Sequence, residues 1–372
     1  MGEMITGVSD LTLVKMSLSF IVDMLFAYSF VFIFPQTLKS KKFYIYFILS
    51  FVFVMFYSCI YSFIKERNYY IEFISGKWTY SPITIGSIFG DKQQWGIFLA
   101  AAVPSSILLC YLAAKFYRER KILKICIIVF SLVTFCLTLV CSLASFCKTA
   151  IIANILAIIV LLVGIALHLI IKKKKILFGV IIFAFLGLFL LIPTIFGSVS
   201  ALKETKLGSL VNSILQTLAD RGEQGAGSRL TILFSFLEKF PATNLMFGFN
   251  KGLLEAYEYS VTPEIINSLH TGIAIYFGRT GLVGLLIYVL LLVKLISCIC
   301  KITKNNILYG FIFFALFVSS LILNLAELEI LITSSSATVF MFNILLVVLP
   351  LSECLSVKEV GYEEKNISFV NC

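Results

Sequence analysis

Long apolar runs with few charges recur along the chain and restrict what it can fold into. A helix that crosses a membrane needs about 20 mostly apolar residues, and the sequence contains nine stretches of this kind. They are residues 11–34, 43–64, 95–117, 122–145, 149–171, 176–198, 272–298, 307–327 and 331–350. The sequence therefore predicts an all-α polytopic membrane protein in which residues 1–372 form a single integral membrane domain.

The composition excludes several classes of protein. Apolar residues make up 60% of the chain and charged residues 13%, whereas soluble domains contain about 50% and about 25% of these residues. Most soluble enzymes, nucleic-acid-binding proteins and disulfide-stapled secreted proteins are therefore excluded, and no nucleic-acid partner is expected. The lipid bilayer is the expected environment of the apolar excess.

Basic residues are distributed unevenly over the connections between the predicted spans. One set of short connections contains a single acidic residue, Glu119, and a large basic excess. Its basic residues are Lys39, Lys41, Lys42, Lys115, Arg118, Arg120, Lys121, Lys124, the four lysines at 172–175, Lys294, Lys301 and Lys304. The alternate connections, residues 65–94 and 199–271, have nearly balanced charge. Because Lys and Arg are enriched in cytoplasmic loops, these two loops are expected to be extracytoplasmic and the tail 351–372 cytoplasmic.

The 199–271 loop is longer than a helix connection needs to be, so a functional site is expected there. A glycine-rich stretch precedes residues 229–240, which are predicted to form a helix ended by Pro241. The apolar side of this helix would consist of Leu230, Leu233, Phe234 and Leu237. Free N–H groups at its start, beside the Arg229 guanidinium, suit a lipid diphosphate. An interfacial anchoring helix whose arginine only touches lipid head groups is the alternative.

His270 lies at the end of this loop, and Arg279 lies in the predicted span that follows it. An imidazole can take up a proton near neutral pH, so His270 is a candidate general base; a structural role of a lone interfacial histidine is the alternative. Arg279 lies in an apolar segment, where a charged side chain is costly and normally faces a polar cavity. Close helix packing would explain the neighbouring glycines, but not the arginine.

Two further charged residues and a group of aromatic residues are predicted on the extracytoplasmic side. Lys148 is the only charge in a short turn between two spans, where it either binds an anion or snorkels to the surface. Glu327, near the outer end of a span, is a candidate for binding an acceptor. The aromatic residues of the 65–94 loop and its end are Tyr69, Tyr70, Phe73, Trp78, Tyr80 and Trp95. They would suit either an interfacial belt or stacking against sugar rings.

Several short motifs follow one another in a particular order over about residues 80–300. They are Gln-Trp95-Gly96, Phe-Cys-Lys148-Thr-Ala, Gly-Ser-Arg229-Leu-Thr-Ile-Leu, Leu-His270-Thr-Gly and Phe-Gly-Arg279-Thr-Gly. This order resembles the O-antigen ligase and polymerase superfamily, and most of all the Wzy-type repeat-unit polymerases of capsules and exopolysaccharides. The resemblance implies a bundle like that of the GT-C glycosyltransferases.

The resemblance also implies roles for individual residues. Arg229 and Lys148 would bind the polyprenyl (undecaprenyl) diphosphate, and His270 would act as the base. Arg279 has no role carried over from the family; its charge in an apolar segment makes it a further candidate for stabilising the diphosphate. Lys148 stands where the family usually has arginine, so it keeps the charge and lacks the bidentate fork. The expected activity is a metal-independent glycosyltransferase in a bacterial plasma membrane, which transfers a lipid-linked glycan to a hydroxyl of the next lipid-linked repeat unit.

Two other activities are compatible with the same features. A ligase would use the same donor with a different acceptor, and a flippase or exporter would move lipid-linked oligosaccharide without forming a bond. With one outer histidine, no paired aspartates and no cysteine cluster, the sequence predicts no metal site and no cofactor. The expected partners are the polyprenyl-diphosphate-linked oligosaccharide, the bilayer, and the flippase and chain-length regulator of the same pathway.

Overall fold

The described part of the protein is almost entirely helical. The computed structural model describes residues 22, 25–38, 40–75, 87–89, 92–117, 119–145, 147–171, 236, 238, 240–248, 272–326 and 343–355. Within these ranges there are helices, turns and short connections, and no β-strand. The prediction of an all-α protein is confirmed for this part of the chain.

Six of the described helices are long and apolar enough to cross a membrane. They are Lys42–Lys65, Gln94–Phe116, Lys121–Ser145, Thr149–Ile171, Thr280–Asn305 and Ile307–Asn324. Each overlaps a predicted span, so the chain is a multi-pass membrane protein. Shorter apolar helices, Leu25–Thr37 and Asn343–Leu355, overlap the predicted spans 11–34 and 331–350. The predicted span 176–198 lies outside the described residues, so the total of nine stays a prediction.

The chain divides into two compact units. The first, here called the α4–α8 unit, consists of Lys41–Gly225 and Ile302–Ser319. The second, here called the α13 unit, consists of Met1–Ser40, Ala226–Lys301 and Ser320–Cys372. Two of the boundaries fall inside helices: Lys301–Ile302 lies in α13 (Gly272–Asn305) and Ser319–Ser320 in α14 (Ile307–Ala326).

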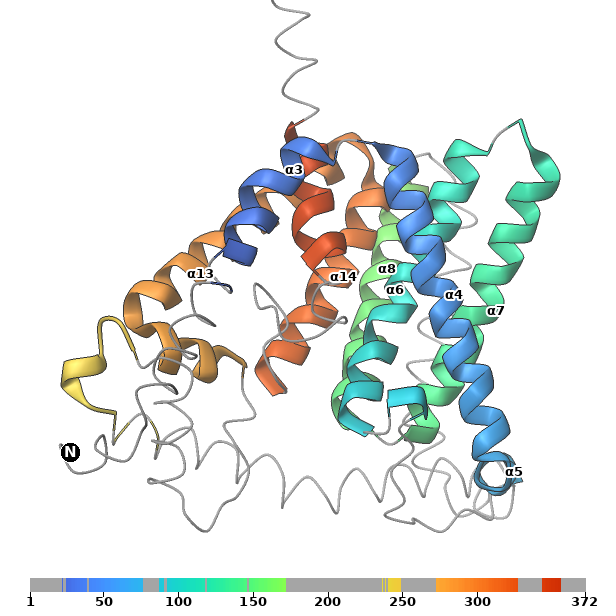
Figure 1. The fold of residues 1–372 in the computed structure, drawn as a ribbon. Helices are drawn as coiled ribbons and strands as arrows, with labels where there is room; N and C mark the ends of the chain where they lie inside the picture. Colours follow the sequence, from blue (N-terminus) through green and yellow to red (C-terminus); the bar gives the residue numbers. More distant parts are fainter. Residues whose placement is uncertain are drawn as a thin grey trace, which may run out of the picture. The chain divides into compact units, whose positions relative to one another are not determined.

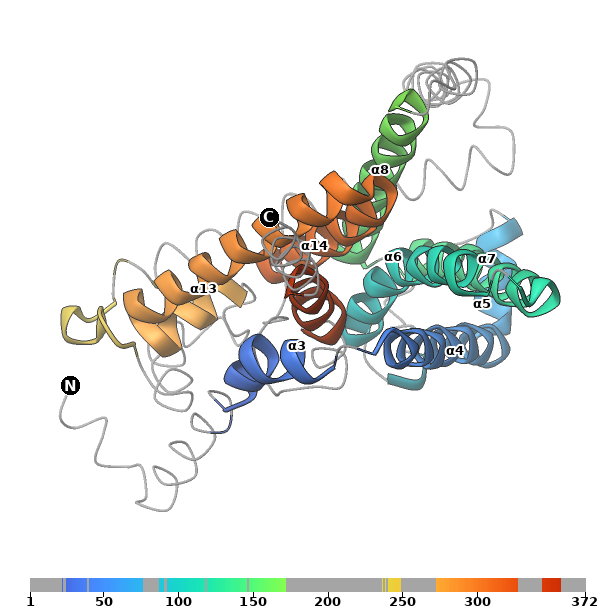
Figure 2. The same cartoon turned by 90° about the horizontal axis from the view of Figure 1, so that it is seen from above.

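Helix α6 forms the centre of the α4–α8 unit. It spans Lys92–Phe116 and packs against α4 (Lys41–Lys65), α7 (Lys121–Ser145) and α8 (Lys148–Ile171). Figures 1 and 2 show α4, α6 and α7 side by side. In the most apolar stretch of α6 78% of the residues are buried, against 33% in α7. Small side chains permit this packing, because they let helix backbones approach closely.

Helix α7 turns its polar side inward. Its buried residues include Ser131, Thr134, Thr138, Ser142 and Ser145, at helical spacing, whereas Ile122 and Ile125 on the other side are exposed. The Thr134 Oγ1 donates to the Phe130 carbonyl at 2.9 Å and the Thr138 Oγ1 to the Thr134 carbonyl at 2.7 Å. Hydroxyls bonded to their own helix can be buried without loss, and the exposed apolar side suits contact with lipid.

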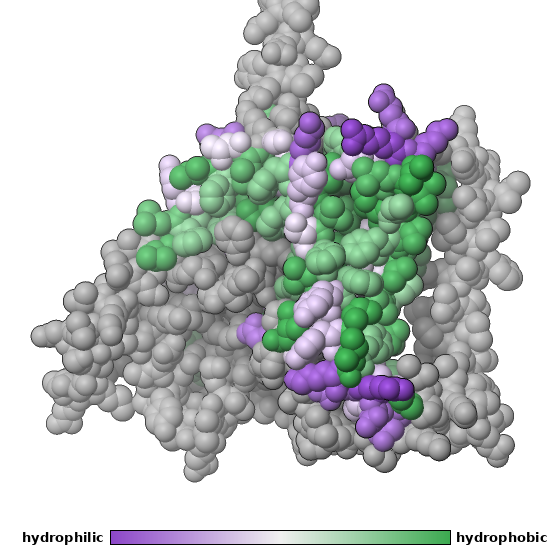
Figure 3. Space-filling model, turned by 45° about the vertical axis from the view of Figure 1, so that its right-hand side comes forward, coloured by the Kyte–Doolittle hydropathy of each residue, from purple (hydrophilic) through white to green (hydrophobic). Residues whose placement is uncertain are grey.

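Charged residues mark the ends of the spans. Helix α4 begins with Lys41 and Lys42 and ends at Lys65, with apolar and aromatic residues between them. Figure 3 shows a corresponding apolar band (green) with hydrophilic residues (purple) at both of its ends. A band of this kind between polar edges is the surface expected of a helix bundle that crosses a bilayer.

The connection between α13 and α14 is fixed by Asn306. Its Nδ2 donates to the Tyr111 Oη of α6 at 2.7 Å, and its Oδ1 accepts the backbone N–H of Tyr309 at 3.1 Å. The second bond makes Asn306 the N-cap of α14. The Tyr111 and Tyr309 rings stack with their centroids 4.9 Å apart, and the Lys115 Nζ lies 5.6 Å from the centroid of the Tyr309 ring.

The α13 unit also contains short helical segments, among them two π-helical turns. A π-helical turn η1 (Ser29–Ile33) continues into α3 (Phe34–Thr37), and η1 contacts the π-helical turn η4 (Asn343–Val348). All residues of η4 are buried, and so is Phe30 of η1. The two π-turns therefore pack an apolar core within this unit.

Candidate functional site

The predicted extracytoplasmic loop 65–94 contains a helix, α5 (Arg67–Ser75). Figure 1 shows α5 turned across the end of α4. The Tyr69 Oη donates to the Ala144 carbonyl of α7 at 2.7 Å, and the Tyr70 Oη lies 2.9 Å from the Ser62 Oγ of α4. Helix α5 is thus held to the ends of two spans by its tyrosines.

Three aromatic residues of this loop and its end, Tyr70, Phe73 and Trp95, pack inside the protein. Only 2% of Tyr70 and 4% of Phe73 is exposed, and Trp95 is fully buried. Burial also raises the pKa of the Tyr70 phenol above its ordinary value, so the phenol stays protonated. These three residues therefore support neither an interfacial belt nor stacking against sugar rings; Trp78 and Tyr80 lie outside the described residues.

The backbone position of Lys148 is set by close packing between two helices. Lys148 is the first residue of α8, and Cys147 before it is buried. A Cβ atom on Gly96 of α6 would collide with the Cys147 Sγ and would come within 2.8 Å of the Cys147 Cβ. The missing side chain at Gly96 therefore allows the turn before Lys148 to lie directly against α6.

The residues around this turn are tied by further hydrogen bonds. The Asn154 Nδ2 of α8 donates to the Ser142 Oγ of α7 at 3.0 Å, and the Ser145 Oγ donates to the Ser142 carbonyl at 2.9 Å. The backbone at Lys148, the first residue of α8, is therefore held in place by these hydrogen bonds and by the packing at Gly96. The start of a helix carries free N–H groups and positive dipole, which favour an anion nearby.

Helix α13 is interrupted at Gly281 in the α13 unit. Gly281 has φ 65° and ψ −161°, which is a conformation essentially limited to glycine. After the interruption the Leu282 N–H donates to the Leu245 carbonyl at 2.9 Å and the Val283 N–H to the Met246 carbonyl at 3.1 Å. Backbone groups of the large loop therefore replace the missing bonds of the helix.

The loop segment that binds at this interruption is a compact turn. The Gly248 N–H donates to the Asn244 carbonyl at 2.6 Å, and the Asn244 Nδ2 donates to the Gly248 carbonyl at 3.0 Å. Gly248 has φ 69°, which glycine adopts at little cost. The turn therefore presents the Leu245 and Met246 carbonyl groups to α13 in a fixed arrangement.

Aromatic rings continue this contact toward the predicted helix 229–240. The Phe236 and Phe240 rings lie 5.3 Å apart, and the Phe240 and Phe277 rings 4.9 Å apart, both measured between centroids. Phe236 and Glu238 are helical whereas Phe240 and Pro241 are not, as expected for a helix that ends at Pro241. Buried Phe236 lies outside the predicted apolar side, whose four residues fall outside the described ones.

The predicted site residues are only partly described. Arg229, His270 and Glu327 lie outside the described residues, as does the glycine-rich stretch before Arg229. Lys148 and Arg279 have described backbones, at the start of α8 and two residues before the Gly281 interruption, but their side chains lie outside what is described. Their roles in a site therefore stay predictions.

The residues that connect the large loop to α13 were not predicted as a group. Gly281 was interpreted as a residue for close helix packing, and Met246 and Gly248 carried no assigned role. The signal in the sequence was weak: Gly248 follows an apolar stretch and Gly281 follows Arg279 and Thr280, and at both positions a glycine permits a turn. Nothing in that pattern pairs two segments so far apart in the chain.

Comparison of the chain with protein-family models, with curated proteins and with solved structures gave no match.

Proposed function

We propose that the protein is a polysaccharide polymerase that works at the outer face of a bacterial plasma membrane. It would transfer a glycan from polyprenyl diphosphate to a hydroxyl group of the next lipid-linked repeat unit. His270 takes the proton of that hydroxyl, whose oxygen then bonds to the reducing-end anomeric carbon of the glycan. The bond between this carbon and the diphosphate breaks, and the diphosphate leaves with the electron pair. This is general-base catalysis with electrostatic stabilisation of the leaving group.

The cationic residues have one shared role in this proposal. Negative charge on the diphosphate grows as the bond to the sugar breaks, so a guanidinium or an ammonium group beside it lowers the barrier. Arg229 and Arg279 are proposed for this role in the α13 unit, and Lys148 has the same role by resemblance. Glu327 remains the candidate for contacting the acceptor. No step requires a metal ion, because basic side chains supply the counter-charge.

The observation that best supports the proposal is the backbone connection between the large loop and α13. The carbonyls of Leu245 and Met246 accept hydrogen bonds from Leu282 and Val283, directly after the segment that contains Arg279. The loop is thereby held at the helix that follows it, which is the arrangement a site built from both would need. A loop that served only as a linker would not need such a connection.

The experiment is chain extension by the purified protein from a single lipid-linked repeat unit. A ladder of products is expected from the unmodified chain and none from His270→Ala at equal protein level and equal thermal stability. His168→Ala, at the other histidine of the chain, is the matched control and should retain the ladder. Arg229→Ala should slow extension strongly, since the leaving group loses its cation.

The same assay separates the alternative activities. A product that forms only after a different acceptor is added would identify a ligase, and movement of the lipid-linked unit across vesicles without bond formation would identify a flippase. Extension should continue in the presence of a chelator. Loss of extension that magnesium or manganese restores would overturn the metal-independent mechanism.

A further inference from the structure

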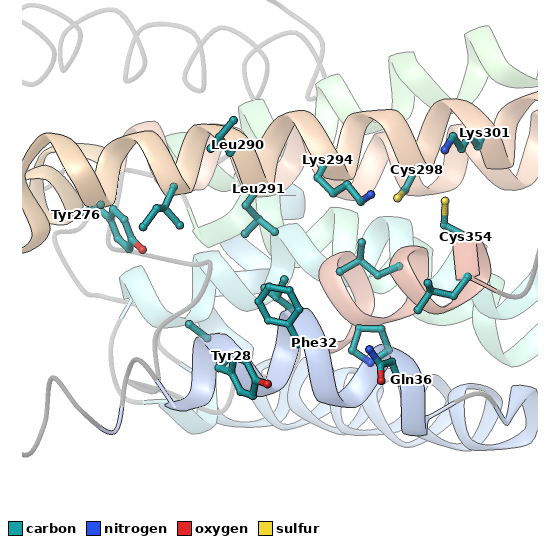
Figure 4. Close-up of a pocket in the computed structure, with 17 residues that line it drawn as sticks. Tyr28, Phe32, Gln36, Tyr276, Leu290, Leu291, Lys294, Cys298, Lys301 and Cys354 are labelled. Atoms are coloured by element: carbon teal, nitrogen blue, oxygen red, sulfur yellow. The ribbon is translucent and has the colours of Figure 1, made fainter. Parts of the chain in front are cut away.

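A cavity of about 640 Å³ lies inside the α13 unit. It opens between the η1–α3 segment, α13 and residues 351–355 (Figure 4). Its wall on α13 is formed by Gly284, Ile287, Leu291, Lys294, Cys298 and Lys301. These residues are alternately three and four positions apart, so they form one continuous stripe along the helix.

The two ends of this cavity differ in chemistry. At one end the lining is apolar or aromatic, with Leu291 of α13 facing Phe32 of η1 (Figure 4). At the other end Lys294 and Lys301 lie on the same stripe, and both lysine side chains are exposed. Two cations therefore stand at one end of an otherwise apolar groove.

The lysines stand two helical turns apart, which corresponds to about 10 Å along the helix axis. Figure 4 shows the Lys294 side chain extending along the groove toward Cys298 and Lys301, with Gln36 of α3 on the opposite wall. An anionic group between the two ammonium groups could accept hydrogen bonds from both lysines.

The groove has the size and chemistry of a lipid site. Its volume falls in the range of about 300–1,000 Å³ that is usual for ligand sites. Lysines that merely snorkelled to the surface would need no cavity beside them. Basic pockets between spans on the cytoplasmic side are a known way of binding anionic lipid head groups, and Lys294 and Lys301 belong to the set of basic residues predicted to be cytoplasmic.

We propose that this groove binds one anionic phospholipid of the phosphatidylglycerol type. An acyl chain lies along the apolar stripe from Gly284 to Leu291, and the phosphate lies between the Lys294 and Lys301 ammonium groups. The proposal does not depend on the proposed polymerase activity, since it concerns other residues and a membrane lipid instead of a sugar donor.

The first test measures lipid retention by native mass spectrometry. The full chain is incorporated in nanodiscs that contain equal amounts of phosphatidylglycerol and phosphatidylethanolamine. The protein is then released from the nanodiscs in the mass spectrometer, and the lipids that stay bound to it are identified. The unmodified chain should retain one phosphatidylglycerol. The double variant Lys294→Gln and Lys301→Gln should lose about tenfold or more of this retention, because each lysine near an anionic lipid contributes about 1 kcal/mol.

Lys304→Gln is the matched control for charge. Lys304 is exposed on the same helix and does not line the cavity, so its loss should leave retention unchanged. The double variant Lys294→Arg and Lys301→Arg should retain the lipid, since the charge is kept. Equal retention of both lipids by the unmodified chain, or equal loss with Lys304→Gln and with the double glutamine variant, would overturn the proposal.

A second test addresses the apolar part of the groove. Ile287 lines the cavity and is 57% exposed, so Ile287→Trp fills the groove without overpacking the core. Retention of phosphatidylglycerol should fall although both lysines are present. Val289→Trp, at an exposed residue of the same helix outside the lining, should have no effect. Unchanged retention in a folded Ile287→Trp variant would show that the acyl chain does not lie there.

Discussion

The backbone carbonyl group of Met246 lies where a side chain on residue 281 would have to be. A Cβ atom placed on Gly281 collides with the C and O atoms of Met246, and it comes within 2.6 Å of the Gly248 nitrogen. These neighbours are backbone atoms and cannot rotate away. The interruption of α13 and its contact with the large loop therefore depend on a glycine at this position.

Gly281→Ala should destabilise the α13 unit by about 1–3 kcal/mol, because it adds strain in a conformation limited to glycine and forces the backbone turn away. Thermal unfolding in detergent measures this loss. Ser297→Ala, at an exposed position of the same helix, is the control and should leave the melting temperature nearly unchanged. Equal melting temperatures for Gly281→Ala and the unmodified chain would contradict the contact with Met246.

Gly96→Ala should destabilise the α4–α8 unit by about 1–3 kcal/mol, since the new methyl group overpacks the turn at Cys147. Because Cys147 supplies the colliding atoms, the double variant Gly96→Ala and Cys147→Gly should recover part of the loss. The double-mutant cycle measures this coupling between the two residues. Additive effects of the two changes would mean that the residues do not touch.

Asn306→Ala should cost about 1–2 kcal/mol, because it removes the N-cap of α14 and leaves the Tyr111 hydroxyl without the bond to Asn306. Thermal unfolding and hydrogen exchange at the start of α14 measure the effect. Its neighbour Asn305 is exposed, so Asn305→Ala provides a control of the same residue type. Faster exchange is expected only in the Asn306 variant.

The predicted orientation can be tested with two cysteine substitutions in the α4–α8 unit. Glu72 is exposed on α5, and Glu119 is exposed in the connection between α6 and α7 at the other end of the bundle. A membrane-impermeant maleimide added to intact cells should label Glu72→Cys, and Glu119→Cys only after permeabilisation. The unmodified chain gives the background of its native cysteines. Labelling in the reverse order would show that the chain has the opposite orientation, and the proposed site would then not be extracytoplasmic.

The spans were predictable because their length and composition are local properties. Residues 43–64, 95–117, 122–145 and 149–171 were predicted, and the helices are Lys41–Lys65, Lys92–Phe116, Lys121–Ser145 and Lys148–Ile171. An apolar run flanked by charges determines where such a helix can begin and end. Little beyond the run itself is needed for this part of the fold.

The interruption of α13 was not predictable in the same way. The run 272–298 reads as one span, and a helix with glycine in it is common in membranes. Gly281 departs from helical geometry because carbonyl groups of Leu245 and Met246, far away in the chain, accept the N–H groups that follow it. This pairing is a tertiary contact between two distant segments, and the hydropathy pattern of either segment does not indicate it.

The loop 65–94 illustrates the same limit for side chains. Its aromatic content suggested contact with either the bilayer interface or sugars, and the presence of α5 was not predicted. Tyr70 and Phe73 are buried because α5 folds back on α4 and α7, where the Tyr70 Oη meets the Ser62 Oγ. The sequence alone does not distinguish an aromatic side chain that packs in a bundle from one that faces lipid or ligand.

The burial of α6 has a consequence for how the chain can diverge over time. Positions such as Ala100, Ala101 and Ala102 have no room for larger side chains because all three are fully covered. Ile122 and Ile125 of α7 are exposed, so other apolar residues can replace them. Distant relatives should therefore keep small residues in α6, while the exposed apolar positions of α7 vary.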